Sequence, residues 1–175
     1  LRQHLGASGQ ISFVAEGALL TRIKSEDTPD YERLIPLEVD DALMDEVEVP
    51  HAGTVRGLGI SQGLTLILGE SNGGRIDLTE AIAQGIYNHV PGDGRESVVT
   101  VADAVAICSE AGRSIQQVDI SAFATELLDG GNPSSYSCKS AGSFSSQAAS
   151  TVEALEAGAR VFKIQASGGA IINLT

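Results

Sequence analysis

Residues 64–77 read LTLILGESNGGRID, and this stretch decides the fold class. The apolar run LTLIL is typical of a short strand that is buried on both faces of a sheet. A glycine-rich loop follows at residues 69–74. Leu78, Ile82 and Ile86 then recur every four residues, which predicts a helix with one apolar face. A strand, a glycine-rich loop and a helix in this order are typical of a phosphate-binding unit in an α/β protein.

The loop has the glycine spacing of a Walker A motif but lacks its chemistry. The motif reads G-x-x-x-x-G-K-[ST]: its amides hold phosphates, its lysine reaches the β- and γ-phosphates, and its hydroxyl holds Mg²⁺. Here Arg75 replaces the lysine and keeps the charge without the compact ammonium, while Ile76 replaces the hydroxyl and cannot bind magnesium. The candidate nucleotide-binding residues, in a degenerate form that we do not expect to function, are Gly69, Gly73, Gly74 and Arg75.

Two carboxylates, Glu70 and Asp77, add negative charge where a polyphosphate would lie. At an effective dielectric constant of about 20, a carboxylate roughly 6 Å from a phosphate charge costs on the order of 3 kcal/mol before screening. We therefore expect ATP binding to be weak or absent. Two glycines separated by four residues are a weak signal in a chain with 20 glycines. On this stretch alone, an ordinary strand–turn–helix unit is an equal alternative.

Further segments follow the loop in a defined order. They are IYNHVPGDGRE at residues 86–96, GRS at 112–114, VDIS at 118–121, AGSFSSQAA at 141–149 and EALEAGA at 153–159. Together they resemble a little-characterised family of predicted ABC-class ATPases, with the loop GGGYHGKST followed by GVYNHIPGDGRE, GRSV…VDIS, SGSTSQAA and EALEAGA. The agreement extends from about residue 11 to about residue 164. The resemblance implies a P-loop NTPase-like α/β core of the ABC class with a mixed sheet.

In that family the Walker B strand ends in Asp-Glu-Asp, where the Asp orients Mg²⁺ and the Glu activates the attacking water. This chain reads VFKIQAS at residues 161–167, so Gln165 replaces the Asp and Ala166 replaces the Glu. Lys163 also places a charge in a strand that is apolar in the family. Because both ends of the active site have changed, we expect no catalytic residues, no metal site and no ATPase activity.

The resemblance also places a signature-like loop at Gly142, Ser143, Ser145, Ser146 and Gln147. In ABC dimers such a loop, at a helix N-terminus, contacts the γ-phosphate bound to the opposite subunit. Ser145 and Ser146 precede a helix expected over residues 147–159, so they also make ordinary N-caps, and we favour this role. For His89 we favour a buried, hydrogen-bonded structural role over a catalytic one. The turn at residues 91–96 is expected to be architectural, with Arg95 available for an internal ion pair.

The remaining pattern divides the chain into an N-terminal β-rich segment, residues 1–60, and a degenerate P-loop core, residues 61–175, of the same domain. Other expected strands, some of them weak, are at residues 11–15, 39–43, 47–49, near Val55, 98–101, 117–120 and 161–164. Residues 25–30 are expected to be a surface loop, and residues 130–146 are a stretch rich in Gly, Asn, Pro and Ser that precedes the last helix. Since the family continues with more strands, we expect the sheet to be truncated after the Walker B strand, with an open edge that a partner covers.

The composition restricts the partners. A formal charge of −12 repels nucleic acid, so we expect protein partners and no nucleic acid. Cys108 and Cys138 lack metal-ligand spacing and are expected to be reduced thiols, as in an intracellular compartment. The three histidines are scattered, and no apolar run approaches the roughly 20 residues of a membrane helix.

We therefore favour a non-catalytic pseudo-ATPase that acts as a structural or assembly subunit of a larger complex, with no cofactor. The alternative is a regulatory protein that binds ATP or ADP without hydrolysis. A third hypothesis is an active ATPase whose missing groups come from another chain. The replacements at Ile76, Asp77, Gln165 and Ala166 favour the first hypothesis.

Overall fold

The computed structural model describes residues 1–23, 28–33, 35–70, 74–127, 130–166 and 169–172. In these residues the helices are α1 (Arg2–Ser8), α2 (Arg75–Gln84) and α3 (Ser143–Glu156), with short 3-10 helices η1 (Asp41–Leu43) and η2 (Pro133–Ser135). The strands β1 (Gln10–Ala15), β4 (Met44–Val49), β5 (Gly53–Ser61) and β7 (Val98–Thr100) form one sheet, and β2 (Arg22–Ile23) and β3 (Thr28–Pro29) form a small separate one. The others are β6 (Thr65–Leu68), β8 (Ala104–Ile107), β9 (Ile115–Val118), β10 (Tyr136–Cys138), β11 (Val161–Ala166) and β12 (Gly169–Ile172).

The first sheet is antiparallel, with the strand order β4-β5-β1-β7. All six residues of β1 are buried, because other elements cover both of its faces. Phe13 packs with Leu5 of α1 and Val47 of β4, whereas Val14 lies in the cluster that contains Ile82 of α2. Neighbouring side chains of a strand point to opposite faces, so β1 joins two parts of the core.

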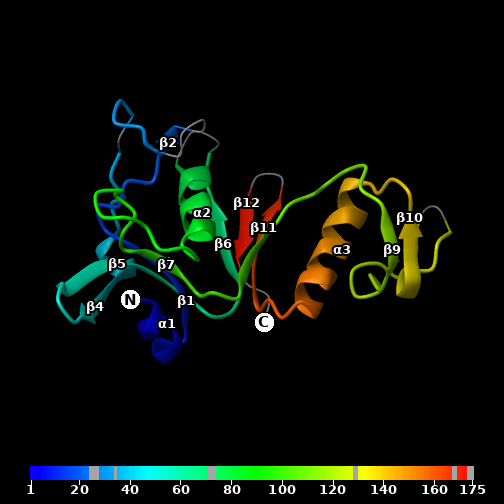
Figure 1. The fold of residues 1–175 in the computed structure, drawn as a ribbon, viewed down its shortest axis with the longest axis horizontal. Helices are drawn as coiled ribbons and strands as arrows, with labels where there is room; N and C mark the ends of the chain where they lie inside the picture. The colour runs from blue at the N-terminus through cyan, green and yellow to red at the C-terminus, as the bar shows by residue number, and fades with distance from the viewer. Residues whose placement is uncertain (24–27, 34, 71–73, 128–129, 167–168, 173–175) are drawn as a thin grey trace.

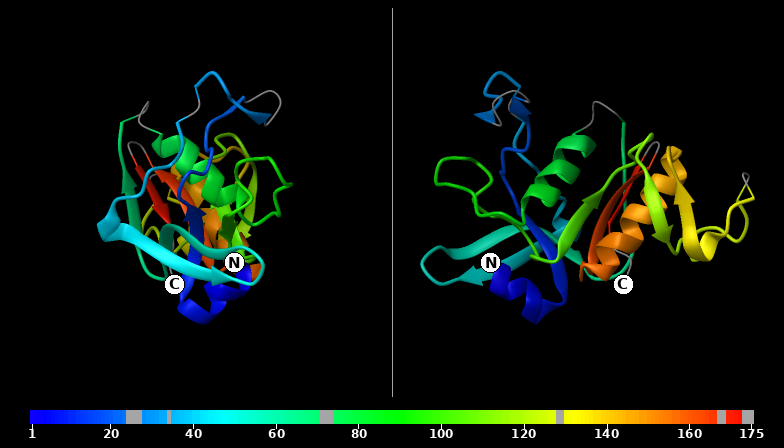
Figure 2. Two further views of the ribbon diagram at one scale, coloured as in Figure 1. Left: turned by 90° about the vertical axis from the view of Figure 1, so that its left-hand side faces the viewer. Right: turned by 45° about the vertical axis from the view of Figure 1, so that its right-hand side comes forward.

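The second sheet is mixed, as expected, with the strand order β6-β12-β11-β8. β11 pairs in parallel with β8, and β12 is antiparallel to both of its neighbours, β11 and β6. Helices cover both faces: Val161 of β11 lies in a cluster with Ile82 of α2, and the next residue, Phe162, packs with Ala154 of α3. Figures 1 and 2 show the red strands β11 and β12 between α2 and α3. The P-loop NTPase-like α/β core expected from the sequence is therefore present.

The run at residues 64–68 forms an edge strand, β6, over Thr65–Leu68, so the expectation of a strand buried on both faces is wrong. Leu64, Leu66 and Leu68 are 70%, 57% and 69% exposed, whereas Ile67 packs towards α2. Among the described strands, β6 pairs with β12 alone. The apolar runs at residues 64–68 and 161–164 predict neighbouring interior strands of one sheet. The shared sheet is confirmed, but β12 lies between β6 and β11, so they are not neighbours. An apolar run indicates that a strand packs against other elements, but it does not indicate how many strands pair with it.

Most expected strands are present, but several segments differ from the prediction. Residues 39–43 do not form a strand, because the Asp40 carboxylate accepts the amide of Ala42 at 2.9 Å and caps η1. Residues 25–27 lie outside the described residues, and Thr28–Pro29 forms β3 rather than a loop. The strands β2, β8, β10 and β12 are not among the expected strands, and β12 continues the second sheet beyond β11, where the sheet was expected to end. α2 ends at Gln84, before Ile86, because the amide of Gly85 closes the helix on the carbonyls of Ala81 and Ile82.

Gly85 allows the end of α2 to contact β7. A Cβ atom at this position would lie 2.7 Å from Thr100 Oγ1 and 3.0 Å from Thr100 N. We predict that Gly85→Ala lowers the free energy of unfolding by roughly 1–3 kcal/mol, as overpacked sites do, measured by urea denaturation. Gly6→Ala is the control, because a Cβ atom there has nothing within 4 Å and alanine favours the α1 helix. Equal stability of the two variants would contradict the prediction.

Candidate functional site

The carboxyl ends of β6 and β11 lie at the same end of the strands in the second sheet. Leu68 at the end of β6 and Ala166 at the end of β11 both pair with Gly169 of β12, one on each side. Since β12 is antiparallel to both strands, β6 and β11 run in the same direction. Ligands of open α/β sheets bind outside the carboxyl ends of the strands. The main chain therefore brings together the two segments that correspond to the Walker A and Walker B positions.

The glycine-rich loop joins this end of the sheet to the N-terminus of α2. Gly69 is exposed, Gly73 lies outside the described residues, and Gly74 is the N-cap of α2 with φ 76°. The left-handed conformation favours glycine at position 74. Arg75 is the first residue of α2, and its Nε donates a hydrogen bond to the carbonyl of Gly69 at 3.1 Å. The side chain at the Walker lysine position thus folds back across its own loop.

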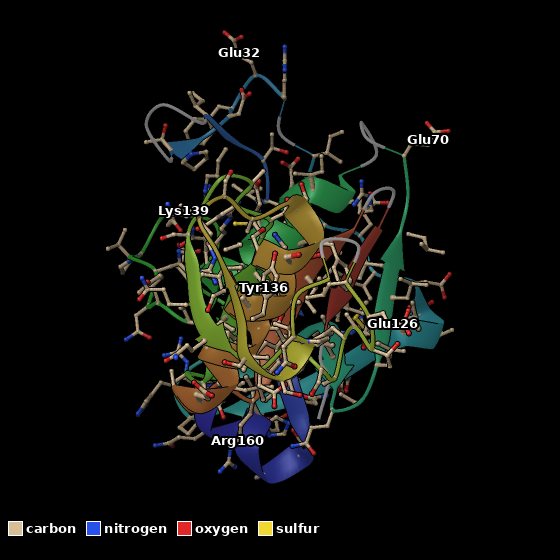
Figure 3. All side chains as sticks on the ribbon, turned by 90° about the vertical axis from the view of Figure 1, so that its right-hand side faces the viewer. Glu32, Glu70, Glu126, Tyr136, Lys139 and Arg160 are labelled. Atoms are coloured by element: carbon tan, nitrogen blue, oxygen red, sulfur yellow. The ribbon has the colours of Figure 1, made fainter. Side chains whose placement is uncertain are left out.

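Carboxylates surround the N-terminal turn of α2. Asp77 lies in this turn, where a negative charge interacts favourably with the helix dipole, and its Oδ2 accepts the hydroxyl of Thr21 at 3.3 Å. Glu70 is exposed and points away from the body of the molecule (Figure 3). A bound polyphosphate would therefore meet one carboxylate fixed at the helix N-terminus and another at the loop.

The signature-like residues lie at the N-terminus of α3, but the expected serine caps are wrong. Gly142 is the N-cap, and no side chain caps this helix. Ser143 is the first helical residue and is exposed, while Ser145 and Gln147 are half-buried within the helix. The helix begins four residues earlier than expected, so the serines lie inside it.

Ser146 is fully buried and fixes α3 to the loop after β8. Its Oγ donates to the carbonyl of Ser143 at 2.9 Å and accepts the amide of Glu110 at 3.0 Å. A side chain occupied in this way contacts its own chain rather than a ligand. The exposed part of the signature-like loop is therefore Gly142, Ser143 and Phe144.

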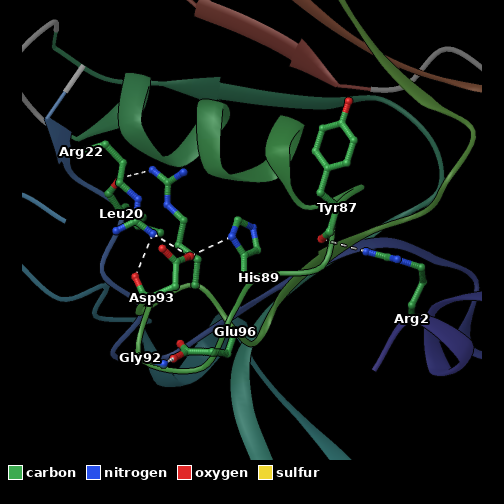
Figure 4. A network of polar contacts seen from close by, with 9 residues as sticks. Arg2, Leu20, Arg22, Tyr87, His89, Gly92, Asp93 and Glu96 are labelled. Carbon is green, nitrogen blue, oxygen red and sulfur yellow. Dashed lines mark hydrogen bonds and ion pairs between the residues drawn. The ribbon is translucent and has the colours of Figure 1, made fainter. Parts of the chain in front are cut away.

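The turn after α2 contains a charged cluster that the sequence did not reveal (Figure 4). Asp93 Oδ2 lies 3.0 Å from Arg22 Nη2 and 2.8 Å from His89 Nδ1. His89 contacts Asp93, but it is half-buried rather than buried as expected, with its side chain 15% exposed. Arg95 is buried and donates to the carbonyl of Leu20. No local spacing links Arg22 to this turn, because the two segments are about 70 residues apart in the chain.

The Glu96 carboxylate accepts hydrogen bonds from main-chain amides, and these lower its pKa. The largest effect comes from the amide of Glu96 itself, and smaller ones come from Gly92, Gly94 and Asp93. The Gly92 amide donates directly to Glu96 Oε1. The hydroxyl and amide of Ser121 likewise lower the pKa of Asp119. Both carboxylates therefore order turns of the chain.

Within the described part of the chain, no group of three or more His, Cys, Asp or Glu side chains could hold a metal ion. The helices described are all too short or too polar to cross a membrane.

A family model described as the P-loop domain of ABC ATPases matches residues 1–170. An uncharacterized protein of Methanocaldococcus jannaschii is 30% identical over 138 residues. This match covers 74% of the chain and 31% of the archaeal protein. The chain thus spans about a third of that relative's length.

We predict that the stabilising effect of Glu96 depends on pH. Because folding lowers the pKa of Glu96, its stabilisation is present above the pKa of the unfolded chain and is lost as the pH falls through the folded-state value. Glu96→Gln should therefore lower the free energy of unfolding at pH 7, and the difference from the wild type should shrink below about pH 4. Glu80→Gln, at an exposed position of α2, is the control. A difference that does not change between pH 7 and pH 3 would contradict the prediction.

Proposed function

The chain belongs to the P-loop domain family of the ABC ATPases, and on this basis we propose that it is a non-catalytic member that serves as a structural or assembly subunit of a larger complex. The observation that carries the proposal is that two changed segments lie near each other, at the carboxyl ends of β6 and β11. Arg75 and Ile76 follow β6, while Gln165 and Ala166 end β11. The fold thus keeps the frame of the site while the groups that hold magnesium and activate water have been replaced.

Phosphoryl transfer depends on positioning and electrostatics, supplied by a lysine, a metal ion and a group that orients the nucleophile. Isoleucine and alanine offer no oxygen for these tasks, and a glutamine amide carries no negative charge to offset Mg²⁺. The Nε–H group of Arg75 already donates a hydrogen bond to the Gly69 carbonyl, so this donor is not available to a phosphate. These features support the loss of catalysis.

The exposed edge of the second sheet supports the structural role. Leu66 and Leu68 of β6 and the residue that precedes the strand, Leu64, are each more than half exposed. They lie beside a row of main-chain groups without a strand partner in the described residues. An apolar edge strand is a template for pairing with another chain. With a formal charge of −12, a protein partner with a basic surface fits better than a nucleic acid.

We predict that the purified protein hydrolyses Mg-ATP at the background rate and shows no micromolar affinity for it in titration calorimetry. The reasons are the missing metal ligands and the carboxylates of Glu70 and Asp77 near the loop. Arg75→Ala should leave the background rate unchanged. Turnover at an ordinary enzymatic rate that Arg75→Ala abolishes would refute the proposal. Binding without turnover would instead favour the nucleotide-binding regulator.

We predict that the β6 edge contributes to assembly. In native extracts of cells that make the tagged protein, the wild type should elute above the size of a monomer in gel filtration. Leu66→Lys with Leu68→Lys should shift it towards the monomer, because charges on an edge strand oppose strand addition. Leu43→Lys, at a site 64% exposed on η1, is the matched control. A wild type that elutes as a monomer would remove the support for the structural role.

A further inference from the structure

A cavity of about 380 Å³ lies between α2 and the second sheet, at the opposite end of α2 from the glycine-rich loop. Its volume is within the range of roughly 300–1,000 Å³ that is usual for small-molecule sites. Side chains of α2 and the turn after it form one wall, and β8 and β11 form the other. The residues on which the argument depends are Ile82, Ile86, Ala104, Ala106, Val161 and Lys163.

Small side chains leave this space open. Ala104 and Ala106 alternate along β8 and face α2, on the side of the sheet that Val161 also faces, whereas Val105 packs towards α3. Larger residues at the two alanine positions would fill the volume between the strand and the helix. The cavity is therefore a consequence of the β8 sequence.

Hydrogen bonds from Arg2 hold the wall after α2 in place. Its Nη2 donates to the carbonyls of Gly85 at 2.7 Å and Tyr87 at 3.2 Å, and its Nε donates to the carbonyl of Thr100 at 3.1 Å. Figure 4 shows the bond to the Tyr87 carbonyl, with the tyrosine ring turned towards the end of α2. A wall fixed by three charge-assisted bonds is pre-formed, which lowers the cost of ordering it around a ligand.

Among the described residues that line the cavity, Lys163 alone is charged. It lies on the α2 face of β11 because the residues on either side of it, Phe162 and Ile164, pack on the α3 face. The hydrogen bonds and ion pairs of the described residues do not include its ammonium group. A half-buried cation beside aliphatic walls, with no carboxylate in the lining, favours an anion that carries an apolar group.

We propose that this cavity binds a medium-chain aliphatic carboxylate, with its carboxylate on Lys163 and its chain against Ile82, Ile86 and Val161. The site is separate from the nucleotide position, because the ten residues of α2 place about 15 Å between the two ends of the helix. Binding of the carboxylate is therefore independent of ATP binding and of assembly through β6.

The test is calorimetric titration of the full chain with sodium octanoate, compared with 1-octanol. The wild type should bind octanoate about tenfold more tightly than octanol, as expected for a charge-assisted hydrogen bond at a partly buried site. Lys163→Met should remove this preference and leave octanol binding unchanged. Lys139→Met, which changes the same charge at an exposed position, should behave as the wild type. Lys163→Arg should retain the preference for octanoate.

A second variant tests the location of the chain. Ala106→Leu should weaken both ligands, because the added methyl groups occupy the cavity. Thermal unfolding of each variant shows that it is folded before titration. Absence of octanoate binding to the wild type, or an equal loss with Lys163→Met and Lys139→Met, would overturn the proposal. Binding that Ala106→Leu leaves unchanged would place the ligand elsewhere and would also overturn it.

Discussion

The position of α2 on the first sheet depends on the hydrogen bonds of one buried residue, Thr100. Its Oγ1 donates to the carbonyl of Ile82 at 2.6 Å and lies 3.0 Å from the hydroxyl of Ser12, and its amide donates to the carbonyl of Gly85 at 2.8 Å. These contacts tie the end of α2 to β7 and β1. Because buried polar groups are costly when unpaired, they allow few other positions for the helix.

The contacts at the C-terminal end of α2 also constrain the position of its N-terminal end, next to the glycine-rich loop. The helix runs from the glycine-rich loop at Gly74 to Gly85 beside Thr100, between the two sheets. Its N-terminal turn follows the glycine-rich loop that leaves the carboxyl end of β6, and its C-terminal turn forms a wall of the apolar cavity. The two ends offer different chemistry, with carboxylates at the first and aliphatic side chains with a lysine at the second.

The sequence predicted the strand–loop–helix unit, because glycine spacing and helical periodicity are local signals. It did not predict that β6 lies at an edge, since the strand order depends on the pairing of β12 with both β6 and β11. The same limit applies to the candidate site. Gly142 rather than Ser145 caps α3, and Arg22 reaches Asp93 from a distant segment. Contacts of this kind depend on the tertiary fold and leave no periodic pattern.

Because the buried core and the glycine-rich loop are separate, the loss of catalysis that we propose need not disturb the fold. The main buried cluster consists of residues of β1, β5, β7, α2 and β11 and of the segment after β1; among the described residues it includes none from 69–70 or 74–76. Replacing a Walker lysine or serine therefore removes no buried apolar contact, so the substitution has little effect on the free energy of folding. Gln165 and Ala166 likewise follow Val161 and Phe162, which supply the buried contacts of β11. Selection on stability alone preserves the frame of such a site and permits its catalytic groups to change, unless turnover is also required.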